Sequence, residues 1–105
     1  MRVIFREDAL ARMDSEVAFT GGYPSPIVSA YRGRIQVLRA APQERAVLPL
    51  RSFRLEPRGN GTSQHSMRVT DDWDLIVAFE DGEDGRVAVV EAMIERTKTK
   101  TEQPS

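Results

Sequence analysis

The chain has 105 residues, of which 40% are hydrophobic, and a formal net charge of −1 at pH 7. A chain of this length forms a single domain with one modest core, which excludes a multi-domain enzyme. Because the sequence contains no cysteine and only one histidine, it also excludes disulfides, a thiol nucleophile, cysteine-ligated metals and multi-histidine metal sites.

The sequence indicates neither a membrane segment nor a secretory signal. The longest strongly apolar run, residues 75–79, is far shorter than the roughly 20 residues that span a bilayer. Residues 1–5 are followed at once by charged Arg6, Glu7 and Asp8, so the apolar stretch of a signal peptide is missing. We therefore expect a cytoplasmic protein.

Charge is unevenly distributed along the chain. Residues 1–70 contain 11 basic and 6 acidic residues, whereas residues 71–105 contain 4 basic and 10 acidic residues. Thirteen of the 15 basic residues are arginine, whose planar guanidinium group suits phosphate. The centre of the basic part consists of Arg32, Arg34, Arg39, Arg45, Arg51, Arg54 and Arg58. Two interpretations remain open: a phosphate-binding surface, and a solvated face with ordinary ion pairs.

The start of the chain predicts one strand and one short helix. Residues 2–5 contain β-branched and aromatic side chains, which favour a strand. Asp8 is a favoured N-cap residue, and we expect it to begin a helix that runs through Met13. Two glycines and a proline within residues 20–24 then predict a loop.

A second helix is the clearest predicted element. Ser25 is expected at its N-cap and Pro26 at its first position, where the missing N–H costs no hydrogen bond. Because Pro42 cannot continue a helix, the helix should end near Ala41. Apolar side chains recur at three- and four-residue spacing and form one stripe, which consists of Ile27, Val28, Tyr31, Ile35 and Leu38.

The second half of the chain predicts strands. After a linker at residues 43–49, residues 51–56 alternate polar and apolar side chains and are expected to form a half-buried strand. Three further strands are predicted at about residues 63–70, 73–80 and 86–94, with turns at residues 71–72 and 81–85. Helices followed by an antiparallel meander indicate one α+β domain over residues 1–96. Residues 97–105 have no strongly apolar side chain and are predicted to be disordered.

The alternation also predicts how two of these strands pair. Met67 and Leu75 are both expected on the core face, so odd-numbered residues must oppose odd-numbered residues. A three-residue loop at residues 70–72 satisfies this condition. It places Arg68 directly opposite Asp74 on the other face, with Cβ atoms ~5 Å apart.

Three stretches of the sequence carry a family resemblance: residues 35–45, residues 50–59 and residues 66–73. The last is the most specific. It reads Ser-Met-Arg-Val-Thr-Asp-Asp-Trp, close to the pattern Ser-(Ile/Met)-Arg-(Val/Ile/Leu)-Asn-Asp-x-Trp. Over residues 1 to about 95 the chain resembles the RelE/HigB family of small toxins from type II toxin–antitoxin systems, and most closely the HigB-like "killer protein" branch.

The resemblance implies a fold and a function. The fold is a helical hairpin packed on a twisted antiparallel sheet, the RelE/ParE-like microbial RNase fold. The function is that of an mRNA interferase, an endoribonuclease that inhibits translation by cutting mRNA in the ribosomal A site, without a cofactor or metal. The implied partners are a HigA-like helix-turn-helix antitoxin, the ribosome and mRNA, and no membrane.

An alternative follows from differences between the chain and the family pattern. Asp74 follows Trp73, where relatives usually carry a second arginine. Residues 91–96 lack the Tyr-His pair that relatives commonly carry after an acidic residue at the end of the last strand. These differences favour a catalytically degenerate member that acts by binding a protein, either an antitoxin-like partner or a gyrase-type target as in the related ParE branch.

The resemblance and the residue chemistry together select candidate site residues. RNA cleavage of this kind needs a base for the 2′-hydroxyl, cations for the charge on the phosphorane, and an acid for the leaving oxygen. Arg58 and Arg68 match phosphate-binding positions of the family and are candidate catalytic cations. The other candidates are Arg51 and Arg54 for phosphate binding, His65 and Glu91 for proton transfer, and Arg32, Arg34 and Arg39 for docking an acidic partner. The competing interpretation is a surface histidine for His65, an edge carboxylate for Glu91, and ion pairs or solvent exposure for Arg51 and Arg54.

Overall fold

The computed structural model describes residues 1–59 and 63–96. Its helices are α1 (Asp8–Ser15) and α2 (Ser25–Ala40), with two short 3₁₀ helices, η1 (Glu44–Ala46) and η2 (Arg51–Phe53). Its strands are β1 (Arg2–Phe5), β2 (Glu56–Pro57), β3 (Gln64–Thr70), β4 (Trp73–Gly82) and β5 (Gly85–Glu95). The predicted tail at residues 97–105 lies outside the described residues, as does part of the predicted glycine loop at residues 58–61.

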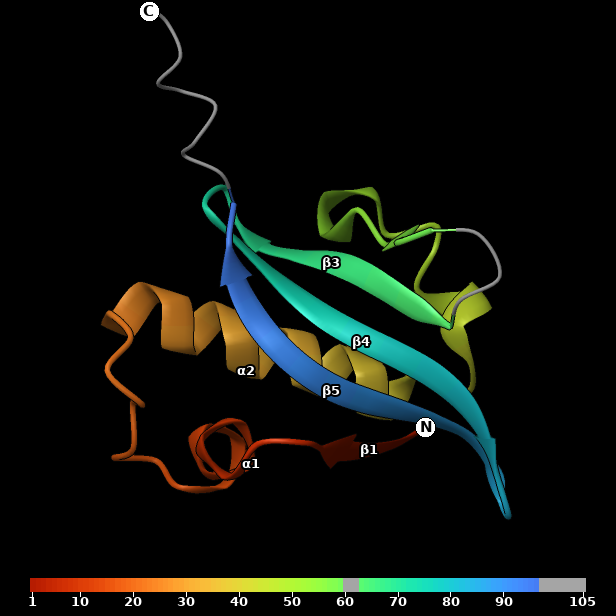
Figure 1. Cartoon of the computed structure of the whole chain (residues 1–105), viewed down its shortest axis with the longest axis horizontal. Helices are drawn as coiled ribbons and strands as arrows, with labels where there is room; N and C mark the ends of the chain where they lie inside the picture. Colours follow the sequence, from red (N-terminus) through yellow and green to blue (C-terminus); the bar gives the residue numbers. More distant parts are fainter. Residues whose placement is uncertain (60–62, 97–105) are drawn as a thin grey trace, which may run out of the picture.

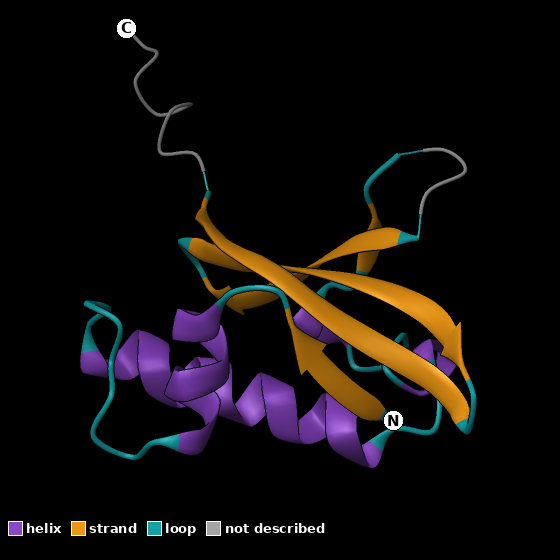
Figure 2. Ribbon diagram, turned by 60° about the horizontal axis from the view of Figure 1, so that its bottom comes forward, coloured by secondary structure: helices purple, strands orange, loops and turns teal. Residues whose placement is uncertain are grey.

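The five strands form one mixed sheet in the order β1-β5-β4-β3-β2. Strands β2 to β5 pair antiparallel, whereas β1 pairs parallel with β5. Both helices pack on one face of this sheet (Figures 1 and 2). The α+β prediction is therefore confirmed, but a wholly antiparallel sheet is wrong, because hairpin patterns do not reveal that the first strand pairs with the last.

The core lies between the two helices and the face of the sheet that they cover. Helix α2 contributes Val28, Tyr31, Ile35 and Leu38 of the predicted stripe, whereas Ile27 is only partly buried and lies outside the core. Helix α1 contributes Leu10 and Met13. The sheet contributes alternate residues, including Met67, Val69, Leu75, Val77, Phe79, Ala88 and Val90. Neither described helix has the length and apolar character of a membrane span.

Both predicted helix caps are wrong by one residue. The carbonyl of Pro24 accepts from the N–H groups of Ile27 and Val28, so α2 already includes Ser25. Helix α1 likewise includes Asp8, with Glu7 at the capping position, and no side chain caps either helix. The first helical carbonyl therefore stands one residue earlier than the capping preferences predict.

The predicted strand over residues 51–56 is also wrong. Residues 51–53 form η2, Arg54 has a left-handed backbone with φ of 46°, and only Glu56–Pro57 pairs with β3. The alternation has another cause: Leu55 enters the core, whereas the ring of Phe53 lies 4.2 Å from the guanidinium carbon of Arg34. Two separate packing contacts thus produce a period of two without a strand.

The β3–β4 hairpin confirms the main register prediction and corrects its loop. Arg68 pairs with Asp74, and Met67 pairs with Leu75. Thr70, however, pairs with Trp73, so the turn is two residues long. The register shift falls at Val69, which forms a β-bulge instead of lengthening the turn.

The β4–β5 hairpin is longer and tighter than the sequence predicts. Gly82 pairs with Gly85, so only two residues separate the strands. A second register shift lies between Ile76 and Val77, which pair with Ala92 and Val90 and leave Glu91 as the extra residue. The bulge interrupts strict alternation in the middle of β5.

Candidate phosphate-binding site

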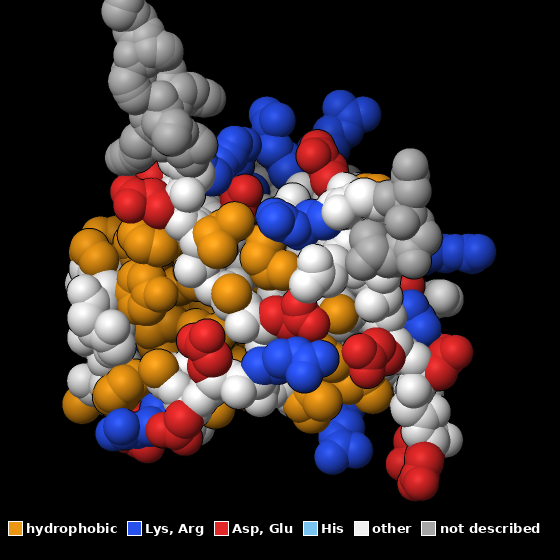
Figure 3. All heavy atoms as spheres, viewed as in Figure 1, with side chains coloured by type: hydrophobic (Ala, Val, Ile, Leu, Met, Phe, Trp, Pro, Cys, Tyr) orange, Lys and Arg blue, Asp and Glu red, His pale blue; other side chains and the backbone are white. Residues whose placement is uncertain are grey.

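One face of the sheet is not covered by the helices, and we call it the open face (Figure 2). Met67 and Leu75 point into the core, so side chains alternate and Arg68 and Asp74 point to the open face. Figure 3 views this face and shows basic side chains gathered along its upper edge, above β3 and near η2. Arginine side chains therefore form a basic surface along this edge of the open face.

A polar pocket of about 140 Å³ lies at this edge. Its described lining consists of Arg54, Glu56, Ser66, Arg68, Asp74 and Arg96, and we call it the arginine pocket. None of these described lining residues is aromatic, so the pocket offers charges and hydrogen bonds and no surface for stacking a base.

Three separate parts of the fold bring these side chains together. Glu56 of β2 pairs with Ser66 of β3, which holds the segment containing Arg54 against the sheet. The N–H of Arg96 donates to the carbonyl of Asp72 over 2.6 Å, directly after the end of β5. The pocket therefore depends on three pairings: β2 with β3, β3 with β4, and β4 with β5.

Asp74 lies between two guanidinium groups of the pocket. Its Oδ1 is 4.0 Å from Nε of Arg68, and its Oδ2 is 3.7 Å from Nε of Arg96. Both distances exceed those of charge-assisted hydrogen bonds. Nε of Arg68 is buried and has no hydrogen-bond partner. Arg68 therefore brings to the wall of the pocket a donor whose hydrogen bond is not satisfied by the surrounding described residues.

The same surroundings shift the pKa of Asp74. Burial raises the pKa of Asp74 above its ordinary value, and Arg96, Arg68 and Arg58 oppose that shift. Glu56 adds to the rise. Three nearby arginines therefore offset only part of the cost of burying the charged carboxylate of Asp74.

Arg34 supports the pocket from the helix side. Its guanidinium group donates to the carbonyl of Arg68 over 2.8 Å and to that of Val69 over 3.1 Å. It also lies over the ring of Phe53, the residue before Arg54. Burial lowers the pKa of Arg34. Arg34 therefore connects the backbone of β3 at Arg68 to the side chain of Phe53 beside Arg54.

The other two arginines predicted to bind a partner have contacts within the chain. Arg32 donates to the carbonyls of Met13, Glu16, Val17 and Phe19, which lie in the last turn of α1 and just after it. Arg39 makes two hydrogen bonds to Asp14, over 3.0 and 2.6 Å. These contacts fix α1 against α2.

The two candidates for proton transfer lie outside the arginine pocket. Glu91 accepts from Arg6 over 3.3 Å and from Gln64 over 2.5 Å, and its side chain is 16% exposed. The ring of His65 packs edge-on against Phe79, with centroids 5.1 Å apart, on the helix-covered face. The sheet thus separates His65 from Arg68.

Arg51 and Arg58 are exposed and do not line the pocket. Of the predicted phosphate-binding residues, the structure therefore brings together Arg54 and Arg68, with Arg58 close enough to act on the pKa of Asp74. Arg96 was missed, because its place depends on the exact register of the β4–β5 hairpin, which the two-residue turn and the extra residue Glu91 set. Its position just beyond the last predicted strand was the only signal.

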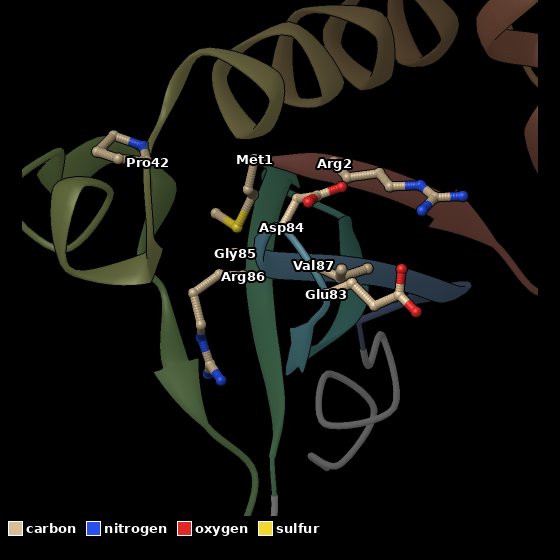
Figure 4. A pocket seen from close by; sticks show the side chains of 8 residues that line it. All are labelled: Met1, Arg2, Pro42, Glu83, Asp84, Gly85, Arg86 and Val87. Atoms are coloured by element: carbon tan, nitrogen blue, oxygen red, sulfur yellow. The ribbon is translucent and has the colours of Figure 1, made fainter.

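A second and larger hollow of about 350 Å³ lies at the β4–β5 hairpin (Figure 4). Its described lining is Met1, Arg2, Pro42, Glu83, Asp84, Gly85, Arg86 and Val87. Figure 4 shows the guanidinium groups of Arg2 and Arg86 extending in different directions. That of Arg86 binds Glu44 and Asp81, so the two arginines do not converge on one ligand.

In the described part of the chain, no three His, Asp or Glu side chains are placed to hold a metal ion. Comparison with known proteins assigns no family: no protein-family model and no curated protein matches the sequence.

Proposed function

We propose that the arginine pocket binds a phosphate group of RNA and that the protein is a RelE/HigB-like toxin that cleaves mRNA on the ribosome. The observation that carries the proposal is the convergence of Arg54, Arg68 and Arg96 in one pocket on the uncovered face of the sheet. Guanidinium groups bind phosphate oxygens through forked, charge-assisted hydrogen bonds and stabilise charge that develops during phosphoryl transfer.

The sequence resemblance supports the same proposal. It assigns phosphate binding to Arg68, which contributes a buried Nε without a hydrogen-bond partner to the pocket. It also implies helices packed on one face of a sheet, which agrees with the observed layers. The finer assignment to the RelE/ParE-like fold is part of the proposal.

A second candidate function is binding without catalysis. It is favoured by the positions of His65 and Glu91, because neither lines the pocket that would hold the phosphate. The titratable acids within the pocket are Glu56 and Asp74. In this alternative the basic edge binds an antitoxin-like partner or a gyrase-type target, and no RNA is cut.

The test compares Arg68→Ala with Arg45→Ala, an exposed arginine that does not line the pocket. Induced alone, the wild-type protein should slow growth, and primer extension should show cuts only in translated mRNA. Arg68→Ala should lower cleavage by ~10²-fold, the usual cost of removing one group that stabilises transition-state charge. Arg45→Ala should cleave like the wild type.

Three outcomes decide between the candidates. Equal cleavage of naked and ribosome-bound RNA would contradict action in the ribosomal A site. Growth inhibition that Arg68→Ala abolishes, without any cleavage, would favour the binding protein. Equal activity of Arg68→Ala and wild type would exclude the arginine pocket as the site.

A further inference from the structure

Asp74 occupies the position between Arg68 and Arg96 that an anionic ligand would need. Its two carboxylate oxygens face one guanidinium group each, at 4.0 and 3.7 Å. The carboxylate side chain is 18% exposed, so solvent screens it only in part. A phosphate that binds these two arginines therefore meets a negative charge already in place.

The backbone prevents Asp74 from leaving the pocket. It pairs with Arg68 on one side and with Ile94 on the other, in the middle of three hydrogen-bonded strands. An aspartate side chain has one methylene group and cannot reach beyond its neighbours. The carboxylate must stay beside any ligand, whereas the long arginine side chains can turn towards that ligand.

The charges that line the pocket nearly cancel. Three guanidinium groups face two carboxylates, so one net positive charge remains among the described lining residues. A phosphodiester within an RNA chain carries one negative charge. A terminal or inorganic phosphate carries between one and two at neutral pH.

We propose that Asp74 is a resident carboxylate that restricts the arginine pocket to singly charged phosphodiesters and disfavours doubly charged phosphates. This inference rests on the proposed function, since it concerns the selectivity of the same pocket. A second charge on the ligand would lie close to Asp74, and no further cation lines the described pocket to neutralise it. Selectivity of this kind favours an internal position of an RNA strand over its phosphorylated end.

The test uses Asp74→Asn, which keeps the size of the side chain and removes its charge. The matched control is Glu80→Gln, which removes one charge from the exposed end of the same strand, outside the pocket. The probes are dimethyl phosphate, which is singly charged, and inorganic phosphate at pH 8, which is mostly doubly charged. Binding is measured by NMR titration of the arginine Nε–H signals at low salt, after circular dichroism has shown that each variant is folded.

The wild type should bind dimethyl phosphate at least as tightly as inorganic phosphate. Asp74→Asn should bind inorganic phosphate about tenfold more tightly than the wild type, because repulsion between neighbouring like charges is lost. Its affinity for dimethyl phosphate should rise less, and Glu80→Gln should match the wild type. If Asp74→Asn does not fold, Asp74→Ser tests the same loss of charge.

The possible failures are distinguishable. An unchanged preference in Asp74→Asn, or weaker binding of both probes, would overturn the role of Asp74, since the carboxylate would then only orient the arginines. Sensitivity to Arg68→Ala in the same titration would leave the proposed pocket intact. Absence of phosphate and RNA binding in all variants would overturn the proposed function itself.

Discussion

Asp74 and Glu44 are partly buried carboxylates whose pKa values shift in opposite directions. Burial raises the pKa of Asp74, so the folded protein binds this proton more tightly than the unfolded chain does. The stability of the wild type therefore falls as pH rises from the unfolded-state pKa through the folded-state pKa. Asp74→Asn, which has no such proton, should be more stable than the wild type at pH 7, and its advantage should disappear near pH 3. Urea unfolding at both values measures the difference; an advantage that persists at pH 3 would contradict the assignment to charge.

Glu44 predicts the reverse behaviour. Arg86 donates two hydrogen bonds to Glu44, over 2.5 and 3.0 Å, and these lower the pKa of the carboxyl group. Its contribution to stability is therefore complete above the unfolded-state pKa and is lost as pH falls through the folded-state pKa. Glu44→Gln should lower the free energy of unfolding by roughly 1 kcal/mol at pH 7 and have a smaller effect near pH 3, below the unfolded-state pKa. A cost that is equal at both pH values would indicate lost packing.

At the scale of the elements, alanine substitutions at two glycines should change the stability in opposite directions. Gly33 lies within α2, and a Cβ placed there meets no atom within 4 Å. Gly33→Ala should therefore stabilise the protein by about 1 kcal/mol, because alanine restricts the unfolded chain. A Cβ at Gly82 would lie 2.6 Å from Cγ2 of Val87 and 3.0 Å from the carbonyl of Gly85. Gly82→Ala should destabilise by ~1–3 kcal/mol, and thermal melts of the two variants should move in opposite directions.

Arg34 joins α2 to the bulge of β3. Arg34→Met would leave the carbonyls of Arg68 and Val69 without this donor, which should cost ~2 kcal/mol of stability. Because one of these carbonyls belongs to Arg68, RNA binding should also weaken at a temperature where the variant is fully folded. Arg34→Lys keeps a positively charged donor and should recover part of the stability. Recovery should be incomplete, because an ammonium group is not a planar fork. Unchanged RNA binding in folded Arg34→Met would show that Arg34 supports the fold alone.

Local patterns predict the parts of the molecule that local physics determines. The stripe of α2 and the opposition of Arg68 and Asp74 follow from side-chain periods of 3.6 and 2. Both predictions are confirmed, except that Ile27 of the stripe lies outside the core. Arg96 enters the pocket through the register of the β4–β5 hairpin, and the bulge at Glu91 shifts that register by one residue. Neither feature has a local pattern. The segment around Phe53 was wrongly predicted to be a strand, because two unrelated packing contacts produce the same alternation of polar and apolar residues.

At the scale of the whole molecule, we propose that a helix-turn-helix antitoxin covers the basic edge of the open face. An acidic segment of such a partner would pair with the arginine pocket and exclude phosphate, and its charge would speed association. Co-expression should give a complex that survives size exclusion at low salt and restores growth, and added salt should weaken it. Arg68→Ala should weaken the complex more than Arg45→Ala does. Failure of two folded chains to co-purify at low salt would contradict the proposed partner.

The order of strands in the sheet also determines when the arginine pocket can form. Strand β1 is synthesised before the other described strands. Its partner is β5, where Arg2 pairs with Val87 and Phe5 pairs with Val90. Strand β1 therefore has no strand to pair with until β5 has been made. Contacts between such distant segments slow folding, to milliseconds or longer in sheet-rich domains. Arg96, the last described residue of the chain, completes the arginine pocket directly after β5. A ribosome must therefore translate the message at least through the codon for Arg96 before the pocket proposed to act on translated mRNA can exist.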